Sequence, residues 1–175
     1  MPIFMDRHYK SGVTHREVAI AHESDVRIQA QYGVHLFTYW FDEQLSTTSC
    51  LAEAPEKKAL SRLHADAHGD VPEDIIEVES SAVEAFLGRV SDPQPAPEDD
   101  GPLVDAAFRA IMFTDLSDFT STTGALGDAA AMGLLRKHNS LVREALDRNH
   151  GREVKFTGDG IMASFARVPD ALSCA

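Results

Sequence analysis

A run of prolines and acidic residues between positions 91 and 102 (SDPQPAPEDDGP) constrains the fold of this chain more than any other feature. The run contains four prolines, four acidic residues and no large apolar residue. Because such a segment buries too little apolar surface to order itself, we expect an extended, semi-stiff spacer. The chain should therefore fold as two domains, residues 1–90 and 105–175, joined by a linker at residues 91–104.

Size and composition agree with two small globular domains. The chain has 175 residues, of which 43% are hydrophobic and 25% charged, as is typical of folded protein. Its formal net charge of −12 repels phosphate backbones, so we expect no nucleic-acid partner and no anionic membrane surface as a partner. The sequence has no apolar run of about 18 residues and no secretion signal. Two cysteines, Cys50 and Cys174, suggest no disulfide framework, and we expect a cytoplasmic location.

The first ninety residues predict strands and helices in the order βαββαβ. Thr14 and Glu17 form the ends of a capping box, which is typical of a helix start, and Gly33 and Gly69 mark helix ends. This order is that of a ferredoxin-like sandwich, in which two helices cover one face of an antiparallel sheet, so the fold class is α+β. The predicted strands span residues 2–8, 34–41, 46–51 and 74–78, and the predicted helices span residues 14–33, 55–69 and 80–90.

Histidines concentrate in this first domain, which holds six of the eight in the chain. His22 and Asp25 are three residues apart on one predicted helix, and His64 and His68 are four apart on the other, so each pair shares a helix face. Imidazole and carboxylate groups, with the Cys50 thiolate, would suit a nickel or zinc ion. The alternative is that these histidines are solvated or hydrogen-bonded to core groups, since spacing does not define mutual geometry.

Four short motifs in residues 2–80 resemble a small bacterial family of ferredoxin-like proteins described as nickel-binding. The motifs are FMDRH at residues 4–8, AHESD at 21–25, GVH at 33–35 and CLAEAP at 50–55. The resemblance implies binding of Ni²⁺ or Zn²⁺, and because a second domain follows in the chain, we expect the first domain to be a regulatory or sensing module. Its candidate ligands are His22, His35, Cys50 and His64.

The second domain contains two apolar runs that each lead into an aspartate. These are IMFTD at residues 111–115 and KFTGDG at residues 155–160, and a long amphipathic helix pattern separates them. A strand, helix, strand, turn, strand order would set Asp115 beside Asp159 at one sheet edge. The predicted strands span residues 105–113, 153–156 and 161–165. The predicted helices span residues 119–125 and 128–151, and a further helix begins at Pro169. Asp128 is the predicted cap of the second helix. The apolar stripe of that helix consists of Met132, Leu135, Val142 and Leu146.

Paired carboxylates at a strand end suit magnesium chemistry. Mg²⁺ prefers oxygen ligands and shares them with substrate phosphates, and two such ions can assist a phosphoryl displacement. Backbone amides near Asp118, Phe119 and Thr120, at a helix start, could meet phosphate oxygens. The alternative is that Asp115 and Asp159 are ordinary turn residues at strand ends.

Several separated motifs in residues 106–175 resemble the opening half of a class III adenylate/guanylate cyclase domain. They are FTDLSDFT at residues 113–120, LGD at 126–128, HN at 138–139, LVRE at 141–144 and GREVKFTGDG at 151–160. The resemblance implies that Asp115 and Asp159 bind two Mg²⁺ or Mn²⁺ ions, that Leu116 lends a backbone carbonyl, and that Lys155 reads adenine. It implies conversion of ATP to cyclic AMP and pyrophosphate at the interface of a head-to-tail homodimer.

The cyclase family has three further functional residues beyond the second hairpin, in a region outside this sequence. They are a second residue that reads the purine, an asparagine that positions the ribose, and an arginine that stabilises the transition state. We therefore expect the N-terminal part of a cyclase, with little or no activity in the 175-residue chain alone, because arginine stabilises the transferring phosphoryl group. Two alternatives remain. One is a metal- or small-ligand-binding module attached to an inactive cyclase remnant, and the other is a regulatory partner of a complete cyclase.

Overall fold

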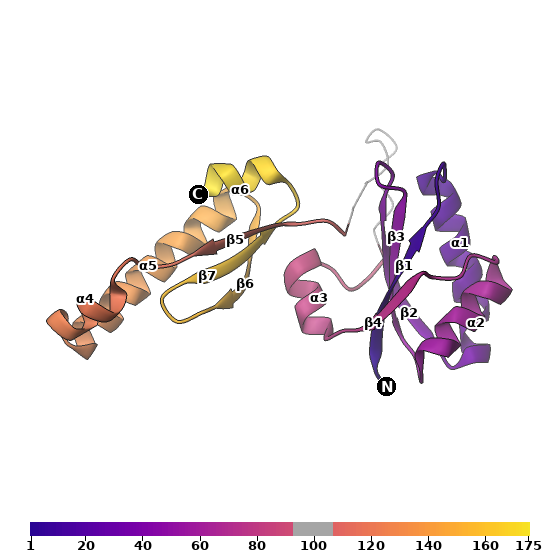
Figure 1. Cartoon of the computed structure of the whole chain (residues 1–175), viewed down its shortest axis with the longest axis horizontal. Helices are drawn as coiled ribbons and strands as arrows, with labels where there is room; N and C mark the ends of the chain where they lie inside the picture. The colour runs from indigo at the N-terminus through magenta and orange to yellow at the C-terminus, as the bar shows by residue number, and fades with distance from the viewer. Residues whose placement is uncertain (93–106) are drawn as a thin grey trace. The chain divides into compact units, whose positions relative to one another are not determined.

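The computed structural model describes residues 1–92 and 107–175, and these residues form two compact units. The first unit comprises Met1–Glu84 and Arg89–Phe108, and the second comprises Ala85–Gly88 and Arg109–Ala175 (Figure 1). Helices and antiparallel strands make up the described residues, so the predicted α+β class is confirmed. Residues 93–104 of the predicted linker lie outside the described residues, and its boundaries stay a prediction.

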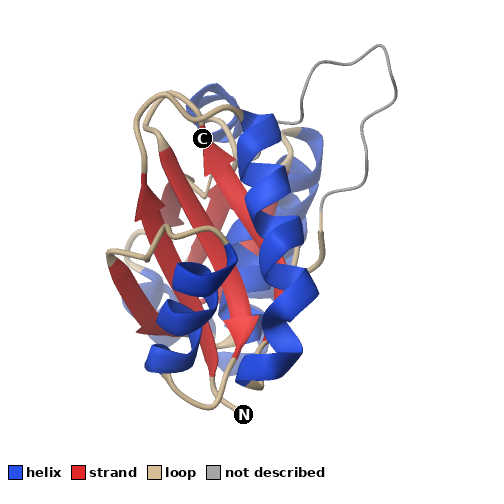
Figure 2. Ribbon diagram, turned by 90° about the vertical axis from the view of Figure 1, so that its right-hand side faces the viewer, coloured by secondary structure: helices blue, strands red, loops and turns tan. Residues whose placement is uncertain are grey.

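The first unit is built on four strands and two covering helices. Its elements are β1 (Ile3–Tyr9), α1 (His15–Ile28), the 3-10 turn η1 (Gln29–Tyr32), β2 (His35–Asp42), β3 (Thr47–Glu53), α2 (Lys57–Ala67) and β4 (Asp74–Glu77). Helix α3 (Ser80–Leu87) follows β4 in the chain. The sheet is antiparallel with the strand order β2-β3-β1-β4, and α1 and α2 lie on the same face of it (Figures 1 and 2). The predicted ferredoxin-like order βαββαβ is therefore confirmed.

Helix α1 begins at the predicted capping box. The Thr14 backbone N–H donates to Glu17 Oε2 at 2.8 Å, and the Glu17 N–H donates to Thr14 Oγ1 at 3.4 Å, so two otherwise unpaired amides of the first turn are satisfied. The predicted single helix over residues 14–33 is in fact α1 followed by η1. Gly33 ends this segment with a φ of +63°, a left-handed conformation that glycine adopts without a steric penalty.

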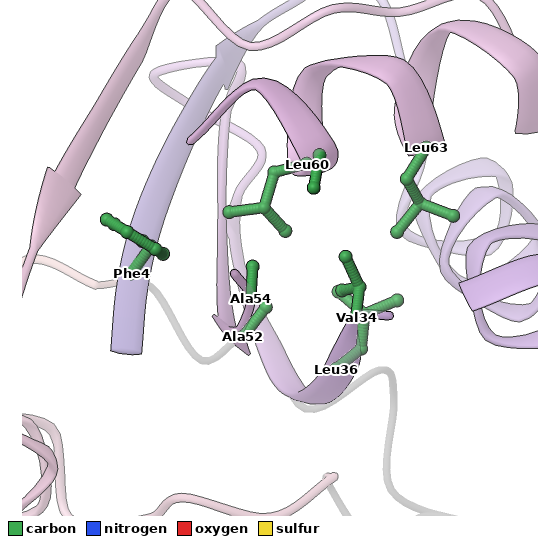
Figure 3. Close-up of a cluster of buried hydrophobic side chains, with 8 residues drawn as sticks. Phe4, Val34, Leu36, Ala52, Ala54, Leu60 and Leu63 are labelled. Carbon is green, nitrogen blue, oxygen red and sulfur yellow. The ribbon is translucent and has the colours of Figure 1, made fainter. Parts of the chain in front are cut away.

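An apolar core fills the space between the sheet and α2 (Figure 3). Leu60 and Leu63 project from α2 toward the strands, and neither side chain is exposed to solvent. Burying a side chain of this size stabilises the fold by about 1.5–3 kcal/mol. The strands and the residues that flank them supply the other members labelled in Figure 3: Phe4, Val34, Leu36, Ala52 and Ala54.

Strand β1 continues from this apolar core into a polar cluster. Phe4, Asp6 and His8 alternate along the strand, and all three are buried. Because side chains two residues apart share one face of a strand, Asp6 and His8 lie in the same row as Phe4, on the side that the helices cover. A buried carboxylate has to be paired, so the partners of Asp6 mark the candidate site.

The second unit contains a three-stranded antiparallel sheet and three helices. Its elements are β5 (Ala110–Thr114), α4 (Phe119–Leu126), α5 (Asp128–Arg148), β6 (Gly151–Phe156), β7 (Ile161–Phe165) and α6 (Val168–Cys174). The strand order is β5-β7-β6, and the buried core combines Leu146 of α5 with Ile161, Ala163 and Phe165 of β7. The predicted hairpin of β6 and β7 is confirmed.

Several predicted details of the second unit are wrong. The described part of the first strand begins at Ala110 rather than near residue 105, and Gly151 starts β6 instead of ending α5. Gly127 is the N-cap of α5, and Asp128 makes no side-chain capping bond. Met132 is 49% exposed, because the N-terminal half of α5 extends past the sheet toward α4 (Figure 1), where no strand covers its apolar positions.

Candidate metal site

The partners of Asp6 come from both covering helices. His64 of α2 is fully buried, and its Nε2 lies 2.9 Å from Asp6 Oδ2. Its Nδ1 lies 3.1 Å from Oδ2 of Asp25, a residue of α1 that is 2% exposed. One imidazole therefore bridges two buried carboxylates from different elements. The opposite Asp6 oxygen, Oδ1, accepts the Cys50 backbone N–H at 3.0 Å.

The bridge determines the charge of these groups. Burial alone would lower the pKa of His64, but the hydrogen bonds and charges of Asp25 and Asp6 raise that pKa to about 9. Burial alone would raise the pKa of Asp6, but hydrogen bonds with His64 and His8 hold it well below its usual value. The pKa of Asp25 is lowered by its bonds to His64 and His68 against the effect of burial. At neutral pH the centre is an imidazolium between two carboxylates.

Two more histidines extend this centre. His68 Nε2 lies 3.2 Å from Asp25 Oδ2, and the Asp70 backbone N–H donates to His68 Nδ1 at 3.2 Å, so the ring proton of His68 is on Nε2. His8 Nε2 lies 3.5 Å from Asp6 Oδ1. The result is two groups of three residues whose nitrogen and oxygen atoms lie within 4.8 Å of one another. They are Asp6, His8 and His64, and Asp25, His64 and His68.

Some buried polar atoms beside this centre have no hydrogen-bond partner among the described residues. They are Asp25 Oδ1 and both ring nitrogens of His22, which is 7% exposed. His22 Nε2 does lie 3.2 Å from Asp92 Oδ1, but without hydrogen-bond geometry. An unpaired buried polar atom costs about 1–3 kcal/mol, so these atoms favour a ligand at this position.

A pocket of about 280 Å³ opens onto these atoms. His8, His22, Asp25, His64, His68 and Cys50 all line it, together with apolar side chains such as Val18 and Tyr39. Its volume exceeds that of a single water, about 30 Å³, several times over, so an ion and its coordinated waters would fit. Imidazole nitrogens with carboxylate oxygens suit Ni²⁺ and Zn²⁺, and the donor set therefore fits the ion that the sequence predicts.

The structure brings three of the four predicted ligands to this pocket. His22, Cys50 and His64 line it, and His35 does not. His35 is exposed on β2, where its ring packs 4.8 Å from the ring of Phe37. Burial and the nearby Asp6 charge raise the pKa of the Cys50 thiol well above its usual value, which disfavours the thiolate that a metal needs. Nitrogen and oxygen donors therefore dominate the site.

The four predicted ligands leave out Asp6, His8, Asp25 and His68 of the centre, although the sequence paired Asp25 with His22 and His68 with His64 on predicted helix faces. Two signals pointed to them. Asp6 and His8 occupy the alternate positions of a strand whose Phe4 is apolar, and a polar residue in such a row is a candidate for a buried pair. Asp25 and His68 share helix faces with His22 and His64, respectively.

The second unit brings its two predicted metal-binding aspartates to the same end of one sheet. Thr114 is paired with Ile161, and the Ile161 N–H lies 3.3 Å from Thr114 Oγ1. Asp115 follows this pair directly, and Asp159 lies in the turn that enters β7. A Cβ at Gly160 would overlap the Thr114 carbonyl, so only glycine allows the turn to approach β5 this closely.

The other predicted residues of this unit surround the same end of the sheet. Leu116 offers its carbonyl to the Phe119 N–H at 3.4 Å. Asp118 has a φ of +54° and precedes α4, whose first turn contains Phe119 and Thr120. Lys155 is exposed on β6, opposite Met162 of β7. The roles of these residues in substrate binding stay predictions.

Comparison with known proteins connects the first unit to a family. The nickel-responsive SCO4226-like family matches residues 4–78. The crystal structure of SCO4226 from Streptomyces coelicolor A3(2) is 34% identical over 43% of this chain and 94% of that chain, with a TM-score of 0.42. None of the curated proteins that were compared matches the chain.

Two structures of a bacterial light-regulated adenylyl cyclase align with 99% of this chain at 12% identity. Their TM-scores are 0.34 and 0.33, and the alignments cover 64% and 63% of the cyclase chains, so this chain spans less than two thirds of their length. Within residues 1–92 and 107–175, no helix is both long enough and apolar enough to cross a membrane.

Proposed function

We propose that the first unit, whose residues 4–78 match the nickel-responsive SCO4226-like family, is a metal-responsive module that binds Ni²⁺. The observation that carries the proposal is the bridge of His64 between Asp6 and Asp25. Three buried ionisable groups from β1, α1 and α2 meet there, beside a pocket that contains further histidines.

The proton on His64 defines how the site would accept a cation. When His64 loses that proton, one nitrogen lone pair becomes available, and the two carboxylates keep a net negative charge that a divalent ion would balance. His8 flanks the bridge and would complete a nitrogen and oxygen donor set with Asp6 and His64. Such a set, without thiolate, favours Ni²⁺ or Zn²⁺ over a soft ion such as Cu⁺.

Equilibrium dialysis with metal analysis tests this proposal. The purified chain is expected to take up Ni²⁺, and His64→Gln should weaken uptake at least about tenfold, because loss of an outer-shell partner alone has that effect. His35→Gln is the matched control, since His35 is exposed and does not line the pocket. Circular dichroism should verify that His64→Gln remains folded. Equal uptake by the chain and by folded His64→Gln would contradict the proposal.

A second function is favoured by the strand register of the second unit. Asp115 and Asp159 lie at one end of the β5-β7-β6 sheet, and the class III cyclase motifs of the sequence contain both residues. The second unit would therefore hold Mg²⁺ or Mn²⁺ with ATP, and Lys155 would select adenine. In a head-to-tail homodimer the first unit would regulate that site. Metal binding by the first unit does not depend on this second function.

Binding of Mn²⁺·ATP tests the second function. Replacing both Asp115 and Asp159 with asparagine is expected to weaken binding by more than about tenfold, because the doubly charged ion loses two carboxylate ligands. Electron paramagnetic resonance measures the free Mn²⁺ directly at increasing protein concentration. Asp147→Asn, an exposed substitution on α5, is the control and should bind normally. If the double variant binds as well as Asp147→Asn does, the two aspartates are ordinary turn residues.

A further inference from the structure

The segment Arg89–Asp92, which we name the strap, lies against the β2 wall of the metal pocket. Its first residue is anchored firmly. The Arg89 guanidinium donates to the Thr38 hydroxyl and to the Tyr39 carbonyl, and it lies over the Trp40 ring at 4.8 Å from the ring centroid. Arg89 Nη1 also donates to the Ser91 carbonyl at 2.9 Å, which folds the strap back on itself.

The last residue of the strap meets the pocket through His22. Asp92 Oδ1 lies 3.2 Å from His22 Nε2 without forming a hydrogen bond, while His22 Nδ1 has no partner among the described residues. The His22 ring packs against Tyr39, with 4.8 Å between the ring centroids. Tyr39 thus contacts His22 through its ring and Arg89 through its carbonyl, and both Tyr39 and His22 line the pocket.

This arrangement has a defined chemical use. A histidine that binds a metal through one ring nitrogen almost always donates its other ring N–H to a carboxylate or carbonyl, which fixes the tautomer and makes the ligand more basic. In His22 one nitrogen is unpartnered and the other lies beside a carboxylate. A cation bound to one ring nitrogen of His22 and the Asp92 carboxylate at the other nitrogen would each strengthen the interaction of the other with the ring.

We propose that His22 is a metal ligand through Nδ1 and that Asp92 is its positioning residue, so that metal binding holds the strap more tightly against the pocket. The inference rests on the proposed nickel binding and adds its means of regulation. Without metal, the contact between Nε2 and Asp92 is weak. With metal, Nδ1 is occupied, Nε2 carries the proton, and its hydrogen bond to Asp92 becomes charge-assisted. Residues 91 and 92 are the first two of the predicted linker, so the strap is where occupancy of the pocket reaches the rest of the chain.

Hydrogen–deuterium exchange of the full chain, read at the backbone amides of residues 89–92, tests the inference. Addition of Ni²⁺ is expected to slow exchange there severalfold. Asp92→Asn should remove this slowing and weaken Ni²⁺ affinity about tenfold, the cost of losing an outer-shell carboxylate. Asp92→Glu should restore both in part. Since Asp92 is 57% exposed, neither substitution disturbs the core. Asp74→Asn, an equally exposed aspartate at 60%, is the matched control and should behave like the unsubstituted chain.

The outcomes separate the inference from the proposed function. Ni²⁺ uptake with unchanged exchange at residues 89–92 would overturn the inference and leave nickel binding intact. Slowing that persists in Asp92→Asn would also overturn it, because the carboxylate would then have no part in the response. No Ni²⁺ uptake by the unsubstituted chain would overturn both. Zn²⁺ provides an independent readout through the fluorescence of Trp40, the single tryptophan, which Arg89 covers and which this closed-shell ion does not quench.

Discussion

Replacing Asp6 with alanine is expected to cost the first unit about 3–5 kcal/mol of unfolding free energy, the range found when one partner of a buried ion pair is removed. Asp6 is 1% exposed and accepts hydrogen bonds from His64 and from the Cys50 backbone N–H. Without it, the Cys50 amide is buried with no acceptor at that position, and His64 keeps one carboxylate where it had two. Urea denaturation followed by circular dichroism measures the loss.

The matched control for Asp6→Ala is Asp74→Ala on the neighbouring strand β4. Asp74 pairs with Arg7, but both side chains are more than half exposed, at 60% and 56%. Exposed ion pairs contribute about 0–1 kcal/mol, so this substitution should be nearly silent. The contrast isolates burial, because the same chemical change is made on adjacent strands of one sheet. Equal losses for the two variants would contradict the account of the bridge.

The metal-free first unit is expected to lose about 3 kcal/mol of stability between pH 6.5 and pH 9, because His64 gives up its bridging proton. In the folded state the carboxylates of Asp25 and Asp6 raise the pKa of His64 from 6.5 to about 9. A group with a raised folded-state pKa stabilises the fold fully below its unfolded value, 6.5, and this contribution is lost as the pH rises through about 9. Asp6 acts in the opposite direction. Its folded-state pKa is depressed, so its contribution is present above its unfolded pKa of 3.8 and is lost as the pH falls further.

Urea titrations at pH 6.5, 7.5 and 9 measure this dependence. The His64→Gln variant supplies the reference slope, because every other titrating group remains in place. Stability of the unsubstituted chain should fall more steeply than that of the variant across this window. Parallel profiles for the two proteins would mean that His64 does not hold its proton through the bridge.

The sequence predicts the frame of the first unit well because the relevant signals are local. The capping box at Thr14 and the left-handed Gly33 each act within a few residues, and the strand order follows from the βαββαβ pattern. The centre of the site is different. Asp6 and His64 are 58 positions apart, and only the packing of α2 on β1 makes them partners. His22 and His35 are both histidines of predicted elements, yet the fold buries one in the pocket and exposes the other.

In the second unit, periodicity identifies an apolar helix face without showing how much of it is covered. Leu146 and Met132 belong to the same predicted stripe, but Leu146 is 2% exposed and Met132 is 49% exposed. The difference arises because only part of the 21-residue helix α5 faces the short sheet. By contrast, the turn at Gly160 was predictable, since glycine beside a short apolar strand signals a hairpin. Hairpin geometry then accounts for Asp159 and Asp115 at one sheet end.

A nickel anomalous difference map from crystals of the chain grown with Ni²⁺ tests the central claim most directly. The account predicts a peak in the pocket about 2.0–2.2 Å from a ring nitrogen of His64, which are ordinary metal–nitrogen and metal–oxygen distances. A carboxylate oxygen of Asp6 or Asp25 should lie at a similar distance, and His22 Nδ1 should face the same ion. A map with no peak in this pocket, or with nickel bound only by residues outside it such as His35, would contradict the account.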